Sequence, residues 1–164
     1  MINRELDIKI LILYVLYKLP SWVDYESLFD VVSENDIGYF DYSDCLADLV
    51  ENGNISRDEN GIRITELGCR NAEEVVSELP YSVRKKTDKL MIPLINRIKR
   101  MQMISADTVL EGNNTYAVLS MSDDEGEIIN LKLLVSDEKQ SEIIKKKFKN
   151  NAEKIYKEIV ELLS

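Results

Sequence analysis

Apolar residues recur at helical spacing through the first half of the chain. The apolar run over residues 10–16 has no polar face, so we expect the first helix to be buried on most sides. Intervals of three and four residues predict four helices, over about 5–18, 25–35, 41–52 and 66–78. Two short strands, over about 54–57 and 62–65, are expected on either side of Asn60-Gly61, a pair whose positive φ angles suit a tight hairpin turn.

The second half begins with one more predicted helix, over about 81–101. After it, the spacing of the apolar residues changes from that of a helix to that of a strand. Pro93 lies inside this helix and should kink or split it near residues 89–93. Alternating apolar positions predict three strands, over about 103–110, 115–121 and 128–135, and the short turns between them favour an antiparallel meander. A last amphipathic helix, over about 138–163, is the natural cover for one face of this sheet.

These elements predict an α+β fold in three parts. Residues 1–80 have the order of a winged helix-turn-helix domain: three helices, a small hairpin and a helix. Residues 81–101 form a connecting helix that is a candidate for dimerisation. Residues 102–164 form a C-terminal domain, in which a three-stranded antiparallel meander is covered by a long helix.

The hairpin region resembles the wing of bacterial winged-helix regulators of the PadR and MarR kind. Those proteins close the wing with a threonine-x-x-glycine step into the next helix, and here the step is Thr65-Glu66-Leu67-Gly68. The whole chain also resembles an uncharacterised bacterial family, known mainly from Gram-positive anaerobes. That family has a leucine-rich first helix, a similar wing and a Leu-Pro-Tyr-Ser-Val-Arg stretch, here residues 79–84. The resemblance implies a fold and, by comparison with PadR-like regulators, a dimer paired through helices outside the winged domain.

The charge of the chain is distributed unevenly between its two halves. The net charge is −9, and residues 1–79 hold six basic against 17 acidic residues. A winged helix that binds DNA would be expected to be basic, because neutralised phosphates supply much of the affinity. The charge of this half therefore opposes the function that its fold favours.

The acidic residues concentrate on the predicted third helix, where DNA recognition would take place. Four of them share one face at intervals of three, four and three residues: Asp41, Asp44, Asp48 and Glu51. No basic residue lies beside them, so insertion of this face into a DNA groove is unfavourable. The face is either solvated, or it binds a basic partner, or it is covered by a basic helix of the protein itself.

Basic residues gather in the connecting helix and, more sparsely, in the hairpin. The first part of the connecting helix carries four of them, Arg84, Lys85, Lys86 and Lys89, with only Asp88 as an opposing charge. The hairpin contributes Arg57 and Arg63. These six residues are the DNA-binding candidates of the chain, although a solvated helix back explains the lysines equally well.

Composition excludes several classes of chemistry. The chain has no histidine, and it shows no glycine-rich phosphate loop, nucleophile elbow or spaced set of metal ligands. Its two cysteines, Cys45 and Cys69, are isolated and are expected to be small buried residues rather than a disulfide framework. We therefore expect no catalytic residues, no metal site and no cofactor.

The sequence thus predicts a cytoplasmic, dimeric, winged-helix transcriptional regulator-like protein that binds DNA. No apolar run approaches the ~20 residues that a membrane-spanning helix needs, so no contact with a membrane is expected. The alternative is a winged helix used for protein–protein contact, with the acidic face of the third helix docking a basic protein. Two amphipathic helices, 81–101 and 138–163, are the candidates for the interface of a homodimer.

Overall fold

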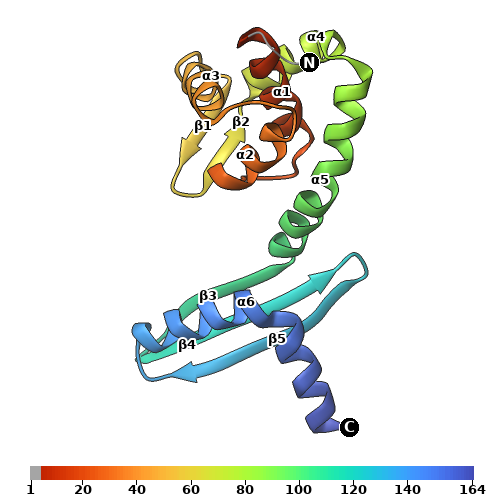
Figure 1. The fold of residues 1–164 in the computed structure, drawn as a ribbon. Coiled ribbons are helices and arrows are strands. Elements are labelled where there is room, and N and C mark those ends of the chain that lie inside the picture. Colours follow the sequence, from red (N-terminus) through yellow and green to blue (C-terminus); the bar gives the residue numbers. More distant parts are fainter. Residues whose placement is uncertain (1–4) are drawn as a thin grey trace. The chain divides into compact units, whose positions relative to one another are not determined.

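The structure, a computed structural model, describes residues 5–164, so residues 1–4 of the predicted first domain lie outside the described residues. The described chain has α+β architecture and divides into two compact units (Figure 1). Unit 1 ends at Ile98 and unit 2 begins at Lys99. Each unit has its own cluster of buried apolar residues.

Unit 1 contains three helices, a hairpin and two further helices. The helices are α1 (Glu5–Lys18), α2 (Tyr25–Ser33), α3 (Tyr39–Glu51), α4 (Glu66–Val75) and most of α5 (Tyr81–Gln102), with a short 3₁₀ turn at Val76–Glu78 after α4. The hairpin strands are β1 (Ile55–Asp58) and β2 (Gly61–Ile64). The predicted order of elements is confirmed, and α1 is buried at eight of its 14 positions, as its unbroken apolar run indicated.

The ends of the helices follow from local side chains. The Asp24 carboxylate accepts a hydrogen bond from the Ser27 amide at the start of α2, and the Thr65 hydroxyl accepts one from the Gly68 amide at the start of α4. Gly53 follows the last residues of α3 with a φ of 74°, a left-handed conformation that glycine adopts without a steric penalty. These three residues fix where the chain turns from helix to helix or from helix to hairpin.

An extended residue between α1 and α2 joins the hairpin. Val23 forms an antiparallel bridge with Ile62 of β2, through hydrogen bonds of 2.9 Å and 2.8 Å that exchange both amides and both carbonyls. Gly61 makes this approach possible, because a Cβ atom at its position would lie 2.4 Å from the Val23 carbonyl oxygen. Gly61 has a φ of 119°, whereas Asn60 does not have a positive φ, so the prediction of positive angles at both turn residues was wrong at Asn60.

Helix α5 runs without interruption through Pro93, so the predicted split is wrong. Pro93 removes a hydrogen bond to the Lys89 carbonyl, but both residues lie on the exposed side, where water can take the missing donor's place. The opposite side of α5 is held in unit 1 by buried Met91, Leu94 and Ile98. This packing keeps the helix continuous.

Unit 2 is a meander of three antiparallel strands with one helix over it. The strands β3 (Ile104–Glu111), β4 (Asn114–Asp123) and β5 (Gly126–Val135) are arranged in the order β3-β4-β5, with a register shift near Ser122. Helix α6 (Glu138–Leu163) packs on one face, with Phe148 1% exposed against Ala117 and Leu119. Asp137 caps its first turn, and a non-helical residue, Asn151, interrupts it.

Candidate functional site

The two hairpin arginines lie on opposite faces of the hairpin. Arg57 is paired with buried Ile62 across the strands, so its side chain is on the inner face, where the guanidinium lies 5.7 Å from the ring centre of Tyr25. Arg63 is paired with Ser56 on the other face, and its guanidinium lies 4.8 Å from the ring centre of Trp22. Both side chains are exposed, but each is oriented by a different aromatic residue.

The acidic face of α3, defined as Asp41, Asp44, Asp48 and Glu51, is accessible at three of its four positions. Asp41, Asp44 and Glu51 are exposed. Asp48 is partly covered, and its carboxylate lies 2.7 Å from the ammonium of Lys9 in α1. The hydrogen bonds from Lys9 to Asp48 and Glu5 raise the pKa of this lysine above its ordinary value. The base that meets this face thus comes from α1, which the sequence pattern did not indicate.

The N-terminal end of the acidic face borders a cavity of about 250 Å³. Its walls include the carboxylates of Glu5, Asp36, Asp41 and Asp44, together with buried Cys45. Burial raises the pKa of the Cys45 thiol to about 11, so this thiol is protonated at neutral pH. Among the described residues, no group of three or more cysteine, aspartate or glutamate side chains is arranged so that it could hold a metal ion.

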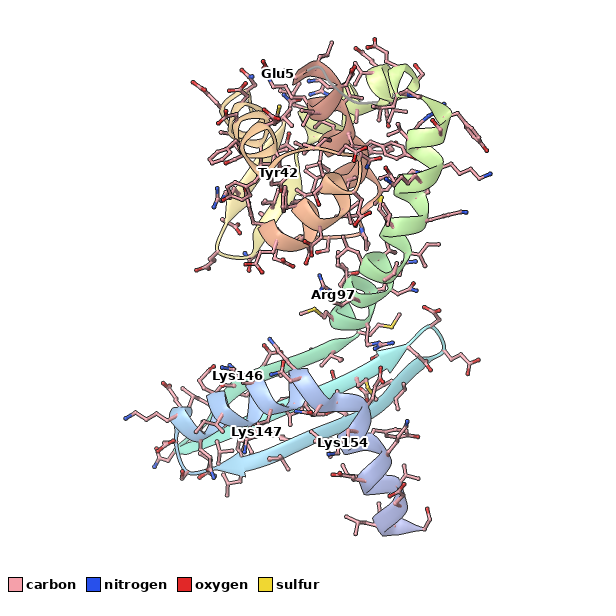
Figure 2. All side chains as sticks on the ribbon, in the orientation of Figure 1. Glu5, Tyr42, Arg97, Lys146, Lys147 and Lys154 are labelled. Atoms are coloured by element: carbon pink, nitrogen blue, oxygen red, sulfur yellow. The ribbon has the colours of Figure 1, made fainter. Side chains whose placement is uncertain are left out.

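Two aromatic residues at the start of α3 were not identified from the sequence. Tyr39 is 52% exposed and Phe40 is 82% exposed, although neighbouring Tyr42 is fully buried inside unit 1 (Figure 2). Phe40 lies four residues before Asp44 and therefore shares the exposed side of the helix. That spacing was the available signal: Phe40 belongs to the polar side of the pattern and not to its apolar side.

The basic face of α5, defined as Arg84, Lys85, Lys86 and Lys89, lies on the first three turns of that helix. Lys85, Lys86 and Lys89 are exposed, and Arg84 is half-buried. The Lys86 ammonium donates a hydrogen bond to the Glu34 carbonyl after α2, and Lys85 lies 5.9 Å from the ring centre of Tyr81. Further along, Arg97 donates to the Ser27 hydroxyl at 2.5 Å and joins α5 to the start of α2 (Figure 2).

Asp88, the one acidic residue within this basic stretch, is neutralised from α1. Its carboxylate accepts hydrogen bonds of 2.6 Å from both the Lys18 ammonium and the Tyr14 hydroxyl. Partial burial raises the pKa of Asp88, but these two hydrogen bonds outweigh it, so the net pKa lies below the ordinary value of 3.8. The carboxylate therefore stays charged at neutral pH and is already paired, which leaves the lysines around it free of its opposing charge.

The six DNA-binding candidates do not form one surface. Figure 1 shows α3 and the hairpin on one side of unit 1 and α5 on the other, so Arg57 and Arg63 are separated from the basic face of α5. The acidic face of α3 is likewise not covered by α5, since the side-chain hydrogen bonds of α5 within unit 1 are made to α1, to α2 and to the residues that follow α2. Unit 1 thus has two distinct surfaces, one acidic with exposed aromatic residues and one basic.

Comparison with known proteins places the chain in a family. The model of a domain of unknown function, DUF4364, matches residues 8–163. The chain belongs to this family. The match spans both units, from α1 to the last turn of α6, which agrees with the full-length resemblance noted in the sequence. No curated protein and no solved structure matches the chain. Among the described helices, none has the length and apolar content needed to cross a membrane.

Proposed function

We propose that unit 1 is a winged helix-turn-helix domain and that the protein is a transcriptional regulator-like protein that binds DNA. The observation that carries this proposal is the bridge between Val23 and Ile62. It adds an extended segment between the first two helices to the edge of the hairpin, so that helices and extended segments alternate as they do in a winged helix. In such domains the third helix and the wing face the DNA.

The charges of unit 1 determine which of its surfaces meets phosphate. Three exposed carboxylates on α3 would be repelled by the backbone of a duplex. The basic face of α5 has no such obstacle, because Asp88 is already bound by Lys18 and Tyr14. We therefore assign the main phosphate contacts to Lys85 and Lys89, with Arg84 and Lys86 beside them. Arg57 and Arg63 are secondary contacts from the hairpin.

The test is a salt series of DNA affinity for the double variant Lys85→Gln/Lys89→Gln. Each phosphate contact contributes about 0.9 to the slope of log K against log salt, so removal of two contacts should flatten the slope by about 1.8. At ~0.1 M salt this corresponds to about 60-fold weaker binding to mixed-sequence duplexes. Fluorescence anisotropy with sheared genomic DNA measures both quantities.

The matched control is Lys146→Gln/Lys147→Gln on α6 of unit 2, where both lysines are exposed (Figure 2). This control should retain the wild-type slope, since those lysines lie outside the proposed contact. Equal losses in the two double variants would show a general charge effect and remove the assignment to α5. A wild-type chain that retains no DNA even at low salt would refute DNA binding altogether.

A second function is favoured by the acidic face of α3 and the exposed aromatic residues beside it. A basic segment of a protein partner would find three exposed carboxylates and the Phe40 ring, which is 82% exposed, on one side of a helix. Under this alternative, Asp41→Lys with Asp44→Lys abolishes partner binding and leaves the fold intact, because neither carboxylate has a structural role of the kind that Asp48 has with Lys9. A partner that still binds this variant would exclude α3 as its docking surface.

A further inference from the structure

Strand β5 of unit 2 has a free edge. It pairs with β4 on one side, and no other described strand pairs with its second side. The strand is ten residues long, and three of its apolar side chains are substantially exposed, at 37% for Ile128, 39% for Leu133 and 65% for Leu134. A long apolar edge presents a row of backbone donors and acceptors that readily pair with another strand.

The opposite edge of the sheet is protected where β5 is not. Helix α6 lies mainly over β3 and β4, and the Thr108 hydroxyl of β3 is hydrogen-bonded to buried Ser141 of α6 at 2.7 Å. β3 also carries an exposed charge at Asp107. The helix and this charge discourage the addition of a strand at β3. On the face of the sheet that α6 covers, the apolar side chains of β5 are left partly exposed.

The one lysine of β5 does not protect its edge. Lysines on edge strands commonly prevent pairing by extending past the edge into solvent. Here the Lys132 ammonium is 2.6 Å from the Glu111 carboxylate and 4.6 Å from the ring centre of Tyr116, so it is directed back across the sheet. Its charge is thereby compensated within unit 2, and the backbone edge beside it stays open.

We propose that β5 pairs antiparallel with β5 of a second copy of this chain, about a two-fold axis at Leu131. Two identical strands that pair antiparallel about a two-fold axis are self-complementary. Residues directly opposite each other on the two strands project from the same face of the joined sheet. A two-fold axis at Lys132 would bring two lysines together. An axis at Leu131 places Lys132 opposite Asn130 of the partner strand.

The charges within β5 support this register. The Asn130 amide donates a hydrogen bond of 3.0 Å to the Glu127 carboxylate. In the proposed pair Lys132, whose ammonium is held by Glu111 of its own sheet, lies opposite the uncharged Asn130 of the other copy, so no like charges face each other at either symmetry-related position. On the other face, Leu133 is set opposite Ile129, so the joined sheet would bury the apolar side chains that α6 leaves partly open.

Variants that place like charges at positions 130 and 132 test the register. Both native side chains, Asn130 and Lys132, are exposed and neither is part of the core. In Asn130→Lys, two lysines face each other at both symmetry-related positions. In Asn130→Glu/Lys132→Glu, two glutamates do so. Each variant alone should dimerise about tenfold more weakly than the wild type, and an equimolar mixture should recover the association as a heterodimer. Sedimentation velocity gives the association, and native mass spectrometry identifies the heterodimer.

The matched control is Asp107→Lys, which changes an exposed charge on the opposite edge of the same sheet and should leave the dimer intact. Circular dichroism confirms that each variant is folded. Variants that dimerise as well as the wild type would overturn the proposal and favour an interface built from helices. It would also be overturned by a wild-type chain that stays monomeric at its highest soluble concentration, or by Asp107→Lys dissociating the dimer as strongly as Asn130→Lys.

Discussion

Replacement of Gly61 by alanine tests the bridge on which the winged-helix proposal depends. Alanine at a φ of 119° is strained by about 1–3 kcal/mol. Its Cβ atom would also lie 2.4 Å from the Val23 carbonyl oxygen, so the extended segment must move away. The movement would break the two hydrogen bonds between Val23 and Ile62, each worth about 0.5–1.5 kcal/mol. The total loss of stability is then about 2–6 kcal/mol.

Gly126→Ala separates the backbone strain from the loss of the bridge. Gly126 has a comparable φ of 139°, but no atom lies within 4 Å of the position of its added Cβ. Gly126→Ala should therefore lower the free energy of unfolding only by the backbone strain of about 1–3 kcal/mol. Urea unfolding followed by circular dichroism measures both free energies, and hydrogen exchange at the Ile62 amide shows whether the bridge has opened. If both variants lost the same unfolding free energy and the Ile62 amide stayed protected from exchange, the close approach of Gly61 to Val23 would be refuted.

The remaining predictions concern titration and thiol reactivity. The pKa of Asp88 is lowered in the folded protein, so its contribution to stability is present above pH ~4 and is lost as the pH falls through the lowered value. Acid unfolding curves should show this decrease, and Asp88→Asn should show less of it. Cys69 should react with iodoacetamide in the native protein before Cys45, which is buried and has a pKa of about 11. Mass spectrometry should find one alkylation in the native chain and two after unfolding, and early modification of Cys45 would contradict its burial.

Local signals in the sequence were sufficient for the order and ends of the elements. Asp24, Thr65 and Asp137 cap the starts of their helices with their side chains, and Gly53 follows the end of α3 with a positive φ, as residues of these types commonly do. Each of these residues acts on its immediate neighbours, within three or four positions of the chain. Local chemistry of this kind can be seen in one sequence without knowledge of the fold.

Pro93 shows where such local reasoning stops. A proline within a helix removes one hydrogen bond, and this cost was expected to kink or split α5. The cost is offset by the packing of Met91 and Leu94, whose partners in unit 1 are far away in the sequence. Propensity is a weak guide where tertiary packing holds the helix in place.

The candidate site depended even more on distant pairs. Arg57 and Arg63 differ by six positions, yet the register of the hairpin places them on opposite faces. A shift of the register by one residue would pair Arg57 with Arg63 on the same face, so their separation depends on how the two strands pair. The neutralisation of Asp88 by Lys18 joins residues 70 positions apart, so the accessible charge of α5 could not be read from its own sequence.

The stacking of Arg63 on Trp22 gives the hairpin a spectroscopic label of its own. Trp22 is the single tryptophan of the chain, and the guanidinium of Arg63 lies 4.8 Å from its ring centre. An anion or a protein surface that engages Arg63 would draw the guanidinium away from the indole and expose the ring to a different environment. The emission of the unlabelled chain should therefore change when the outer face of the hairpin is occupied. Occupation of the basic face of α5 alone should leave it unchanged, so one titration distinguishes which surface of unit 1 a ligand has met.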